Sequence, residues 1–341
     1  MKVSNHPKVA IITRTKDRGI LLERAILSVH KQTMGDFIHM IVNDGGKRET
    51  VDNLLKKHQK LIKGRVKVIH NTKSQGRGSA SNQGIRATNS VYIAIHDDDD
   101  TWHPDFLKKT TNYLDKTKCM GVWVATDVVV ERIDGKSVKQ LSKTRWLPQF
   151  GDVLLYTLCL DNYLISFLYN RDVFKTIGYY DESLSTCEDW DFNLRFVEHF
   201  DVDFIDSPHA LAYYHHRPAQ KGIYGNSVLA GEDQHNHNRT MLANRYLREE
   251  MKNGKLGKGY FMNSLTLQRE NRMALEMQIA DLRSQIAQIN VTVDDIFTKM
   301  PEHILAHIDQ TIYQRTSVVH ILGRMVKIIK RSPKVSIKEK E

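Results

Sequence analysis

Short apolar runs alternate with amphipathic stretches over the first hundred residues of this 341-residue chain. The runs at residues 9–12, 37–42, 66–69 and 91–95 contain β-branched residues and stop at polar or Gly-rich segments, as buried strands do. Between them lie stretches with the apolar spacing of helices. Strands that alternate with helices predict an α/β fold with a mainly parallel, Rossmann-like sheet flanked by helices. Ligands of such sheets bind at the carboxyl ends of the strands.

Beyond residue 100 the strand signal continues but becomes irregular. Val122–Val130 alternates like one strand and precedes a turn signal at Asp134–Gly135. Residues 151–170 are apolar without a clear period. We expect one globular domain over residues 1–225, followed by a helical linker over residues 226–262.

A different pattern fills residues 263–300. Seven apolar residues step by four and three positions, which is the spacing of a coiled-coil seam over about three heptads. They are Leu275, Ile279, Leu282, Ile286, Ile289, Val293 and Ile296. A helix packed on the globular domain is the alternative, but the polar residues between the seam positions favour self-association. The expected partner is therefore a second copy of the chain in a homo-oligomer.

The last segment, residues 301–341, combines apolar and basic positions. Apolar residues between positions 318 and 329 form one helical face, and basic residues such as Arg324 and Lys327 are interleaved with them. Such a helix is expected to bind an anionic membrane surface. A surface helix with a solvated basic face is the alternative, and nucleic acid is the least favoured partner.

Composition and charge narrow the class of protein. With 40% hydrophobic and 26% charged residues, the chain is expected to be globular, and no apolar run approaches the roughly 18–20 residues that span a bilayer. Residues 1–7 lack an apolar signal stretch, so the expected location is the cytoplasm, with the tail at the inner face of the plasma membrane. Half of the net charge of +10 lies in residues 323–341, where seven Lys or Arg stand against two Glu. The three cysteines are an odd number at wide spacing, which fits neither a disulfide framework nor a CxxC metal site. We therefore expect them to be reduced thiols.

Four consecutive aspartates, Asp97 to Asp100, follow the apolar run at residues 91–95. They have no packing use and repel one another, so a positive group is expected among them. Oxygen-only ligands favour a hard cation, Mg²⁺ or Mn²⁺, shared with substrate phosphates. The spacing of two positions lets Asp97 and Asp99 reach one ion from the same side of an extended segment. A solvated acidic turn is the alternative, but it does not explain so apolar a preceding strand.

Several segments form an ordered set of motifs: Val9 to Arg18, Leu22 to Ile26, Ser28-Val29 with Gln32-Thr33, Val42 to Gly45, Ala80 to Gly84, His96 to Pro104 and Cys187 to Arg195. Taken in order, they resemble the N-terminal half of family 2 inverting glycosyltransferases with the GT-A fold. The resemblance spans about residues 8–220 and makes the domain over residues 1–225 catalytic. It implies a metal-dependent enzyme that moves a hexose-type sugar from a nucleotide sugar, with UDP as the expected nucleotide. The implied acceptor is a glycan or a lipid-linked glycan in cell-surface polysaccharide synthesis.

The resemblance also implies roles for single residues. Thr15 and Asp44 correspond to residues that hold the nucleotide base, with Asp44 accepting a hydrogen bond from the uracil ring N–H. Asp97 is expected at the ribose or the metal, and Asp99 at the metal. Arg77 is expected as an additional contact to the nucleotide.

Some positions depart from the family's commonest pattern or have a weaker assignment. Arg14-Thr15-Lys16 replaces Pro-Thr-Tyr, Asn43 replaces the first Asp of a pair, and Ser81 replaces Arg. These departures leave the identity of the base open. Asp98 is placed beside the nucleotide, with tuning of the local field or capping of the next turn as alternatives.

Transfer with inversion needs a carboxylate that takes the proton from the acceptor hydroxyl. Asp189 matches the family's general base, and Glu188 and Asp191 are its nearest rivals. A helix cap is an alternative role that is compatible with catalysis. His215 and His216 are candidates for a third metal ligand that the sequence does not separate, and an ordinary strand-end histidine is the alternative.

Two other functions remain open at this stage. A nucleotidyltransferase of sugar metabolism also combines an α/β sheet, a metal and a nucleotide, but it predicts a Gly-rich loop directly after the first strand, where glycine occurs only at Gly19. An inactive glycosyltransferase-like scaffold is the second alternative, and the intact carboxylates Asp97, Asp99 and Asp189 argue against it. The sugar and the acceptor depend on the variable segment at residues 136–183.

Overall fold

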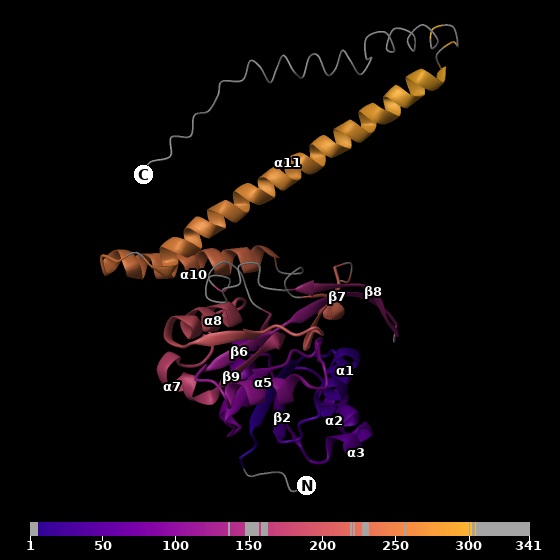
Figure 1. The fold of residues 1–341 in the computed structure, drawn as a ribbon. Coiled ribbons are helices and arrows are strands. Elements are labelled where there is room, and N and C mark those ends of the chain that lie inside the picture. The colour runs from indigo at the N-terminus through magenta and orange to yellow at the C-terminus, as the bar shows by residue number, and fades with distance from the viewer. Residues whose placement is uncertain are drawn as a thin grey trace. The chain divides into compact units, whose positions relative to one another are not determined.

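The computed structural model describes residues 6–135, 137–146, 157, 163–218, 220, 222–226, 232–255, 257–299, 301 and 304. The chain divides into two compact units, Met1–Leu267 and Gln268–Glu341, and each is described by itself (Figure 1). The first unit holds both sheets.

A seven-stranded sheet forms the centre of the first unit, with the strand order β10-β6-β9-β4-β1-β2-β3. Its strands are β1 (Val9–Thr15), β2 (Phe37–Asp44), β3 (Val66–Asn71), β4 (Tyr92–Ile95), β6 (Gly121–Val124), β9 (Phe167–Asn170) and β10 (Val202–Ile205). Only β9 runs antiparallel to its neighbours, β4 and β6. The predicted parallel sheet is confirmed, because the four predicted runs become β1 to β4.

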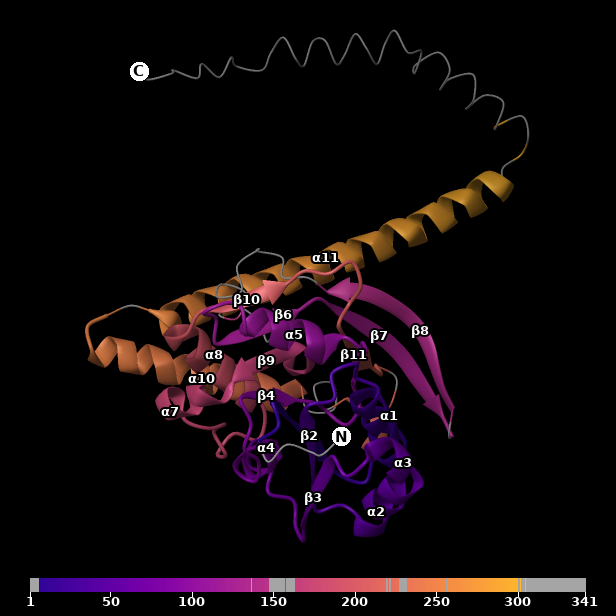
Figure 2. The same ribbon diagram turned by 60° about the horizontal axis from the view of Figure 1, so that its bottom comes forward.

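A second sheet has four strands, in the order β5-β11-β7-β8. Its strands are β5 (Thr101–Trp102), β7 (Thr126–Asp134), β8 (Ser137–Trp146) and β11 (Ala212–His216). β7 and β8 form a long hairpin, visible as the paired arrows in Figure 2. β5 directly follows the acidic run and pairs with β11, so the run lies beside the strand that carries His215 and His216.

The structure corrects the expectation of one strand over Val122–Val130. Two strands, β6 and β7, occupy this stretch, and Ala125 between them belongs to neither. β6 pairs with β10 and β9 in the large sheet, whereas β7 pairs with β11 and β8 in the small one. The alternating pattern is continuous because both strands have buried positions, so the sequence does not mark the change of sheet.

Helices cover the two faces of the large sheet and extend beyond it. They are α1 (Gly19–His30), α2 (Arg48–Lys57), α3 (Gln59–Ile62), α4 (Arg77–Arg86), α5 (Phe106–Leu114), α7 (Phe174–Ile177), α8 (Glu188–His199), α10 (Glu232–Lys252) and α11 (Lys258–Lys299). Short 3₁₀ helices occur at η1 (Leu164–Ser166), η2 (Arg171–Val173) and η3 (Gly222–Tyr224). Among the described helices none is both long and apolar enough to cross a bilayer.

The core explains why the strand runs are apolar at every position. β1 is buried along its whole length. Ala10 and Ile12 pack in one cluster with residues of α4, and Val9 and Ile11 pack in another with residues of α1 and α5. A strand buried on both faces has no polar side, as is typical of parallel sheets. Gly84 of α4 allows the close approach, because an added Cβ would lie 2.5 Å from Ile12 Cγ2.

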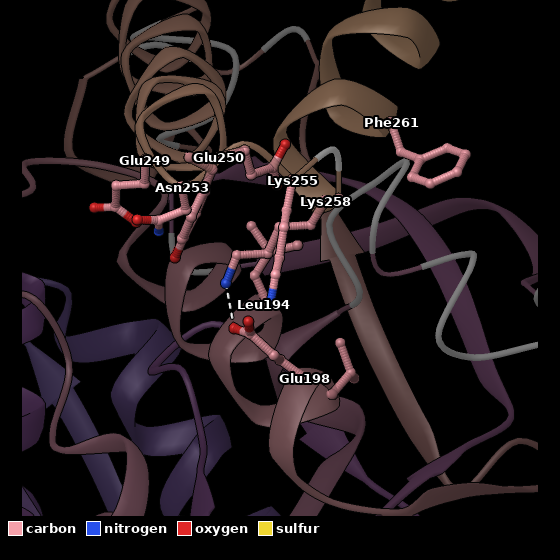
Figure 3. Close-up of a pocket in the computed structure, with 11 residues that line it drawn as sticks. Leu194, Glu198, Glu249, Glu250, Asn253, Lys255, Lys258 and Phe261 are labelled. Carbon is pink, nitrogen blue, oxygen red and sulfur yellow. Dashed lines mark hydrogen bonds and ion pairs between the residues drawn. The ribbon is translucent and has the colours of Figure 1, made fainter.

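A third hydrophobic cluster joins α10 and the start of α11 to α8. Trp190 and Leu194 of α8 pack with Leu242 and Tyr246 of α10 and with Met262 of α11. A cavity of about 600 Å³ lies beside this cluster, lined by α8, α10 and the start of α11 (Figure 3). Among the lining residues, Lys258 pairs with Glu198.

Candidate active site

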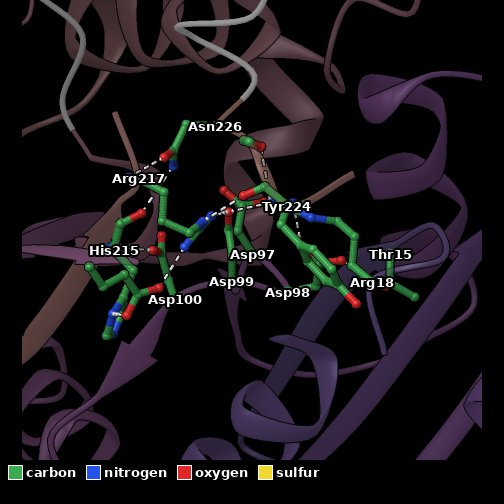
Figure 4. Close-up of polar contacts among 12 residues, drawn as sticks. Thr15, Arg18, Asp97, Asp98, Asp99, Asp100, His215, Arg217, Tyr224 and Asn226 are labelled. Atoms are coloured by element: carbon green, nitrogen blue, oxygen red, sulfur yellow. Dashed lines mark hydrogen bonds and ion pairs between the residues drawn. The ribbon is translucent and has the colours of Figure 1, made fainter. Parts of the chain in front are cut away.

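The acidic run lies at the carboxyl end of β4, next to the end of β1. β1 and β4 are parallel neighbours, and the main chain of His96 donates to Ile12 O, which aligns the two strand ends. Thr15 at the end of β1 donates from Oγ1 to Asp98 Oδ2 at 2.7 Å. The structure therefore brings the predicted nucleotide residue Thr15 into direct contact with the acidic run (Figure 4).

Two arginines neutralise the centre of the run. Arg18 donates from Nη1 to Asp98 Oδ1 at 2.8 Å and from Nη2 to Asp99 Oδ2 at 2.7 Å. Arg217, which is fully buried, also contacts Asp99 Oδ2. Burial alone would raise the pKa of Asp99, but the two guanidinium groups hold it below its ordinary value. Burial raises the pKa of Asp98 to about 7 against the opposite effect of Arg18.

Residues 222–226, which follow β11, contact the two arginines and His215. Arg217 donates from Nε to Tyr224 O at 2.7 Å, and Asn226 donates from Nδ2 to His215 O at 3.0 Å. Arg18 lies 3.4 Å from Gly225 O through Nη2. Arg18 and Arg217 therefore connect the acidic run to residues 222–226.

His215 is part of a buried network around Glu131 of β7. Its Nδ1 lies 2.8 Å from Glu131 Oε2, and its Nε2 lies 2.9 Å from Thr101 Oγ1. Glu131 also contacts Arg24 and Arg217, at 2.7 and 2.8 Å. Burial would raise the pKa of Glu131, but His215 and Arg24 lower it. Both ring nitrogens of His215 are thus engaged within the chain, and its role as a metal ligand stays a prediction.

His216 lies on the other face of β11 from His215. Its ring stacks on Tyr214, with the ring centroids 6.2 Å apart, and it is half-buried. Burial lowers the pKa of His216 below its ordinary value. The structure leaves His216 closer to an ordinary strand histidine than to the aspartates' network, and its ligand role stays a prediction.

Arg14 connects the acidic run with the start of α8. Its Nη2 contacts Asp97 Oδ1, and its Nη1 lies 3.1 Å from Glu188 Oε1. Arg77 of α4 approaches the same Glu188 oxygen with Nε at 3.4 Å. Burial would lower the pKa of Arg14, but Asp97 and Glu188 raise it, so the guanidinium keeps its charge. Motifs about ninety residues apart in the sequence therefore meet in one buried cluster.

The three candidate bases at the start of α8 differ in their surroundings. Glu188 is buried against Arg14, and its Oε2 has no hydrogen-bond partner within the described residues. Asp191 is also buried, bonded to Arg195 at 2.7 Å and to the Tyr246 hydroxyl at 2.9 Å. Asp189 is half-buried and accepts from the main chain of Trp190 at 2.9 Å. Of the three, Asp189 combines partial exposure with a place beside the cluster.

Asp44 holds the loop at residues 71–76 through several hydrogen bonds. Its carboxylate accepts from Asn71 Nδ2 at 2.9 Å, from Ser74 Oγ at 2.7 Å, and from the main-chain N–H groups of Gln75 and Gly76 at 2.9 and 3.1 Å. Burial would raise the pKa of Asp44, but these hydrogen bonds lower it. Four donor groups thus share its two oxygens, and the contact from Asp44 to the uracil ring stays a prediction.

The donor set of the run suits a cation that substrate phosphates help to hold. Asp97 Oδ1 and Asp99 Oδ2 are taken by arginines, and the second oxygen of each carboxylate has no hydrogen-bond partner within the described residues. Among those residues no group of three or more His, Cys, Asp or Glu forms a metal cluster. Mg²⁺ is often bound by one or two carboxylates together with phosphate oxygens and water. Asp97 and Asp99 fit such a site.

Several residues of the cluster were not assigned a function from the sequence. Arg14 lies near the end of β1 and Arg18 follows that strand, so their charge was visible in the sequence but their partners were not. Glu131 gave no signal, because a single Glu in an alternating strand is ordinary.

The mainly parallel sheet flanked by helices is a fold of the GT-A type. The glycosyl transferase family 2 model matches residues 10–178. Residues 10–178 therefore form a glycosyltransferase family 2 domain, and the chain is a glycosyltransferase. This result favours sugar transfer over the nucleotidyltransferase alternative.

Curated relatives agree with the family. An uncharacterised glycosyltransferase of Methanocaldococcus jannaschii is 25% identical over 204 residues, which cover 59% of this chain and 68% of the relative. A glycosyltransferase of PGL/p-HBAD biosynthesis from Mycobacterium tuberculosis is 28% identical over 193 residues, covering 55% of this chain and 69% of the relative.

Two solved structures share the fold at low sequence identity. The mannosyltransferase PcManGT from Pyrobaculum calidifontis, solved with GDP-Man and Mn²⁺, has a TM-score of 0.54 and 13% identity, covering 93% of this chain and 83% of its own. TarS of S. aureus, solved as residues 1–349 with UDP-GlcNAc, has a TM-score of 0.50 and 19% identity, covering 63% of this chain and 59% of its own. This chain therefore spans less than two thirds of the TarS chain that it matches.

Proposed function

We propose that the protein is an inverting glycosyltransferase that moves a sugar from a nucleotide sugar to a glycan or lipid-linked acceptor with the help of Mg²⁺ or Mn²⁺. The observation that carries the proposal is the double contact of Arg14 with Asp97 and Glu188. It gathers the acidic run and the helix start that bears Asp189 into one site. A donor-side carboxylate pair and an acceptor-side base are the two parts that an inverting displacement requires.

Each residue then has a chemical task. Asp97 and Asp99 hold the cation, which neutralises the leaving nucleoside diphosphate when bound. Thr15 and Asp98 fix the wall of the site next to the nucleotide through their mutual hydrogen bond. Asp189 accepts the proton of the acceptor hydroxyl as that oxygen attacks the sugar carbon from the side opposite the diphosphate. Arg14 and Arg77 pair with the carboxylate of Glu188, and thereby fix the helix start on which Asp189 lies.

The donor is a nucleoside diphosphate sugar. PcManGT and TarS were solved with GDP-Man and UDP-GlcNAc respectively, which supports the donor class and leaves the base open. We propose UDP as the first candidate. We propose that Thr15 and Asp44 contact the base and that Arg77 provides an additional contact to the nucleotide.

A nucleotide-release assay tests the proposal. The full chain is supplied with UDP-GlcNAc, UDP-glucose or GDP-mannose, with Mn²⁺ or Mg²⁺ or with EDTA, and with or without membrane extract. We expect release from one donor that requires the metal and increases with extract. Nucleotide binding without release from any donor, with or without extract, would instead favour an inactive scaffold.

The location of the acceptor is a separate part of the proposal. We propose that the basic segment at residues 318–331 brings the enzyme to the inner face of a membrane that carries lipid-linked acceptors. This segment lies outside the described residues. Removal of the chain from Val318 onward should shift the protein from the membrane fraction to the supernatant, and unchanged recovery with membranes would contradict the proposal.

A further inference from the structure

The second unit exposes a continuous apolar seam on a single helix. α11 runs without interruption from Lys258 to Lys299. From Leu275 to Ile296 its seven seam residues are each between 39% and 60% exposed. At about 1.5 Å per residue this stretch is roughly 30 Å long. A row of large aliphatic side chains of this length is far more apolar surface than solitary exposed residues provide.

The order of residue types along the seam fits pairing with an identical helix. Ile279, Ile286 and Val293 occupy the a positions of the heptads, and all three are β-branched. Leu275 and Leu282 occupy the first two d positions, and Ile289 and Ile296 occupy the last two. In parallel coiled coils, β-branched residues at a together with Leu at d favour two strands, and the first half of the seam has this pattern.

The positions beside the seam permit self-association without charge repulsion, although the chain as a whole has a net charge of +10. Glu276 is paired with Arg272 on its own helix at 2.9 Å. Gln285 donates to Asp281 at 2.8 Å, and Lys299 pairs with Asp295 at 2.7 Å. When two copies align in register, Gln278 of one copy faces Arg283 of the other, and Gln285 faces Asn290, so like charges do not face each other at these positions.

We infer that residues 275–296 of α11 form a parallel, in-register, two-stranded coiled coil with a second copy of this chain. The opposite face of the same helix provides a matched comparison. Met277 and Val291 lie at f positions and are 67% and 69% exposed, so they are as apolar and as accessible as the seam but face away from it. If exposure of apolar residues alone drove self-association, residues on both faces would contribute to it. Heptad pairing involves the seam residues only.

Light scattering coupled to size exclusion on the full chain tests the inference. We expect the wild type to have the mass of two copies. The double variant Ile279→Asp with Ile286→Asp should have the mass of one copy, and the f-face variant Met277→Asp with Val291→Asp should keep the mass of two. Retained nucleotide binding in both variants shows that the first unit is folded. A monomeric wild type, a mass of three copies, or dissociation of the f-face variant would overturn the inference.

Cysteine cross-linking tests the direction of the pair and does not depend on a charged substitution. Val293→Cys lies near one end of the seam, so a parallel pair brings its two copies together. Under mild oxidation we expect a disulfide-linked pair that wild type and Val291→Cys do not form. If Val293→Cys cross-links only when mixed with Ile279→Cys, the helices are antiparallel and the inference is wrong. These outcomes are independent of donor turnover.

Discussion

Arg14 and Glu188 form a buried ion pair, with Nη1 of Arg14 3.1 Å from Oε1 of Glu188. Their side chains are 7% and 2% exposed, respectively. Arg14 is also held by Asp97, so the pair is the link between the acidic run and α8. Removing one partner of a buried pair leaves the other charge without compensation. The acidic run and the start of α8 are therefore energetically coupled through one guanidinium group.

Glu188→Gln should lower the free energy of unfolding by about 3 kcal/mol, because it leaves the buried Arg14 with one fewer counter-charge. Urea unfolding measures the loss. Asp172→Asn is the matched control, since Asp172 pairs with Lys175 at 2.7 Å on the surface, with both side chains more than half exposed. Such a pair contributes at most about 1 kcal/mol. Equal losses in the two variants would mean that the buried pair has no special weight.

The same variant should also change donor recognition. Glu188 Oε2 is buried without a hydrogen-bond partner among the described residues. Buried acceptors are normally paired, so a ligand hydroxyl is the expected donor. Glu188→Gln should weaken binding of the nucleotide sugar about tenfold, corresponding to the roughly 1.4 kcal/mol of one charged hydrogen bond, and leave the affinity for UDP unchanged. Calorimetry with UDP and with the UDP-sugar separates the two, and equal weakening of both would place Glu188 away from the sugar.

Asp189→Asn and Asp191→Asn should have opposite effects. Asp189→Asn removes the proposed base and should reduce transfer by at least about 100-fold, with donor binding and stability close to wild type. Asp191→Asn breaks a buried bond to Arg195 and weakens that to Tyr246, so it should lower stability while the folded fraction keeps turning over. Stopped-time product assays at matched folded concentration compare them. Near-normal transfer by Asp189→Asn would refute its role as base.

The sequence was sufficient for the parts of the fold whose signal is local. The strands β1 to β4 are apolar because they are buried on both faces, and the acidic run and Asp189 lie in contiguous motifs. The change of sheet at Ala125 was not visible, because β6 and β7 have the same alternating pattern and differ only in their distant partners.

The roles of individual polar residues depended on contacts that no local pattern records. Asp44 seemed free for a nucleotide, yet its four donors come from residues 71–76, about thirty positions later. His215 was a reasonable metal ligand by residue type, but Glu131 and Thr101 come from two other strands to bind both ring nitrogens. Residue type and order thus locate the site, whereas the division of labour within it is set by long-range pairing.

Arg18→Gln should increase the affinity of the acidic run for Mn²⁺ in the absence of donor. Arg18 contacts Asp98 and Asp99, and its removal takes a positive charge away from the place where the cation binds. We expect a several-fold lower dissociation constant in a Mn²⁺ titration followed by electron paramagnetic resonance. Arg48→Gln is the control, because Arg48 pairs with Asp52 on the exposed side of α2. A weaker affinity in Arg18→Gln would indicate that Arg18 organises the run for the metal rather than competing with it.

Two buried histidines should make the domain sensitive to acid. His30 and His39 lie in contact, with His30 Nε2 3.4 Å from His39 Nδ1. Burial, assisted by Arg65, lowers the pKa of His30 to about 4, and burial together with His30 lowers that of His39 well below its ordinary value. The unfolded chain, with pKa values near 6.5, therefore binds more protons than the folded chain between about pH 4 and 6.5, so stability falls as the pH decreases through this range.

For His30 alone the expected loss between pH 7 and pH 5 is about 2 kcal/mol, from the difference between a folded pKa near 4 and an unfolded one near 6.5. Urea unfolding at the two pH values measures it. His30→Gln should make the pH dependence shallower by this amount, because the neutral amide has no proton to gain, whereas His209→Gln at an exposed loop position should keep the wild-type dependence. If the slopes of wild type and His30→Gln coincide, the acid sensitivity arises elsewhere, and the buried pair is not its source.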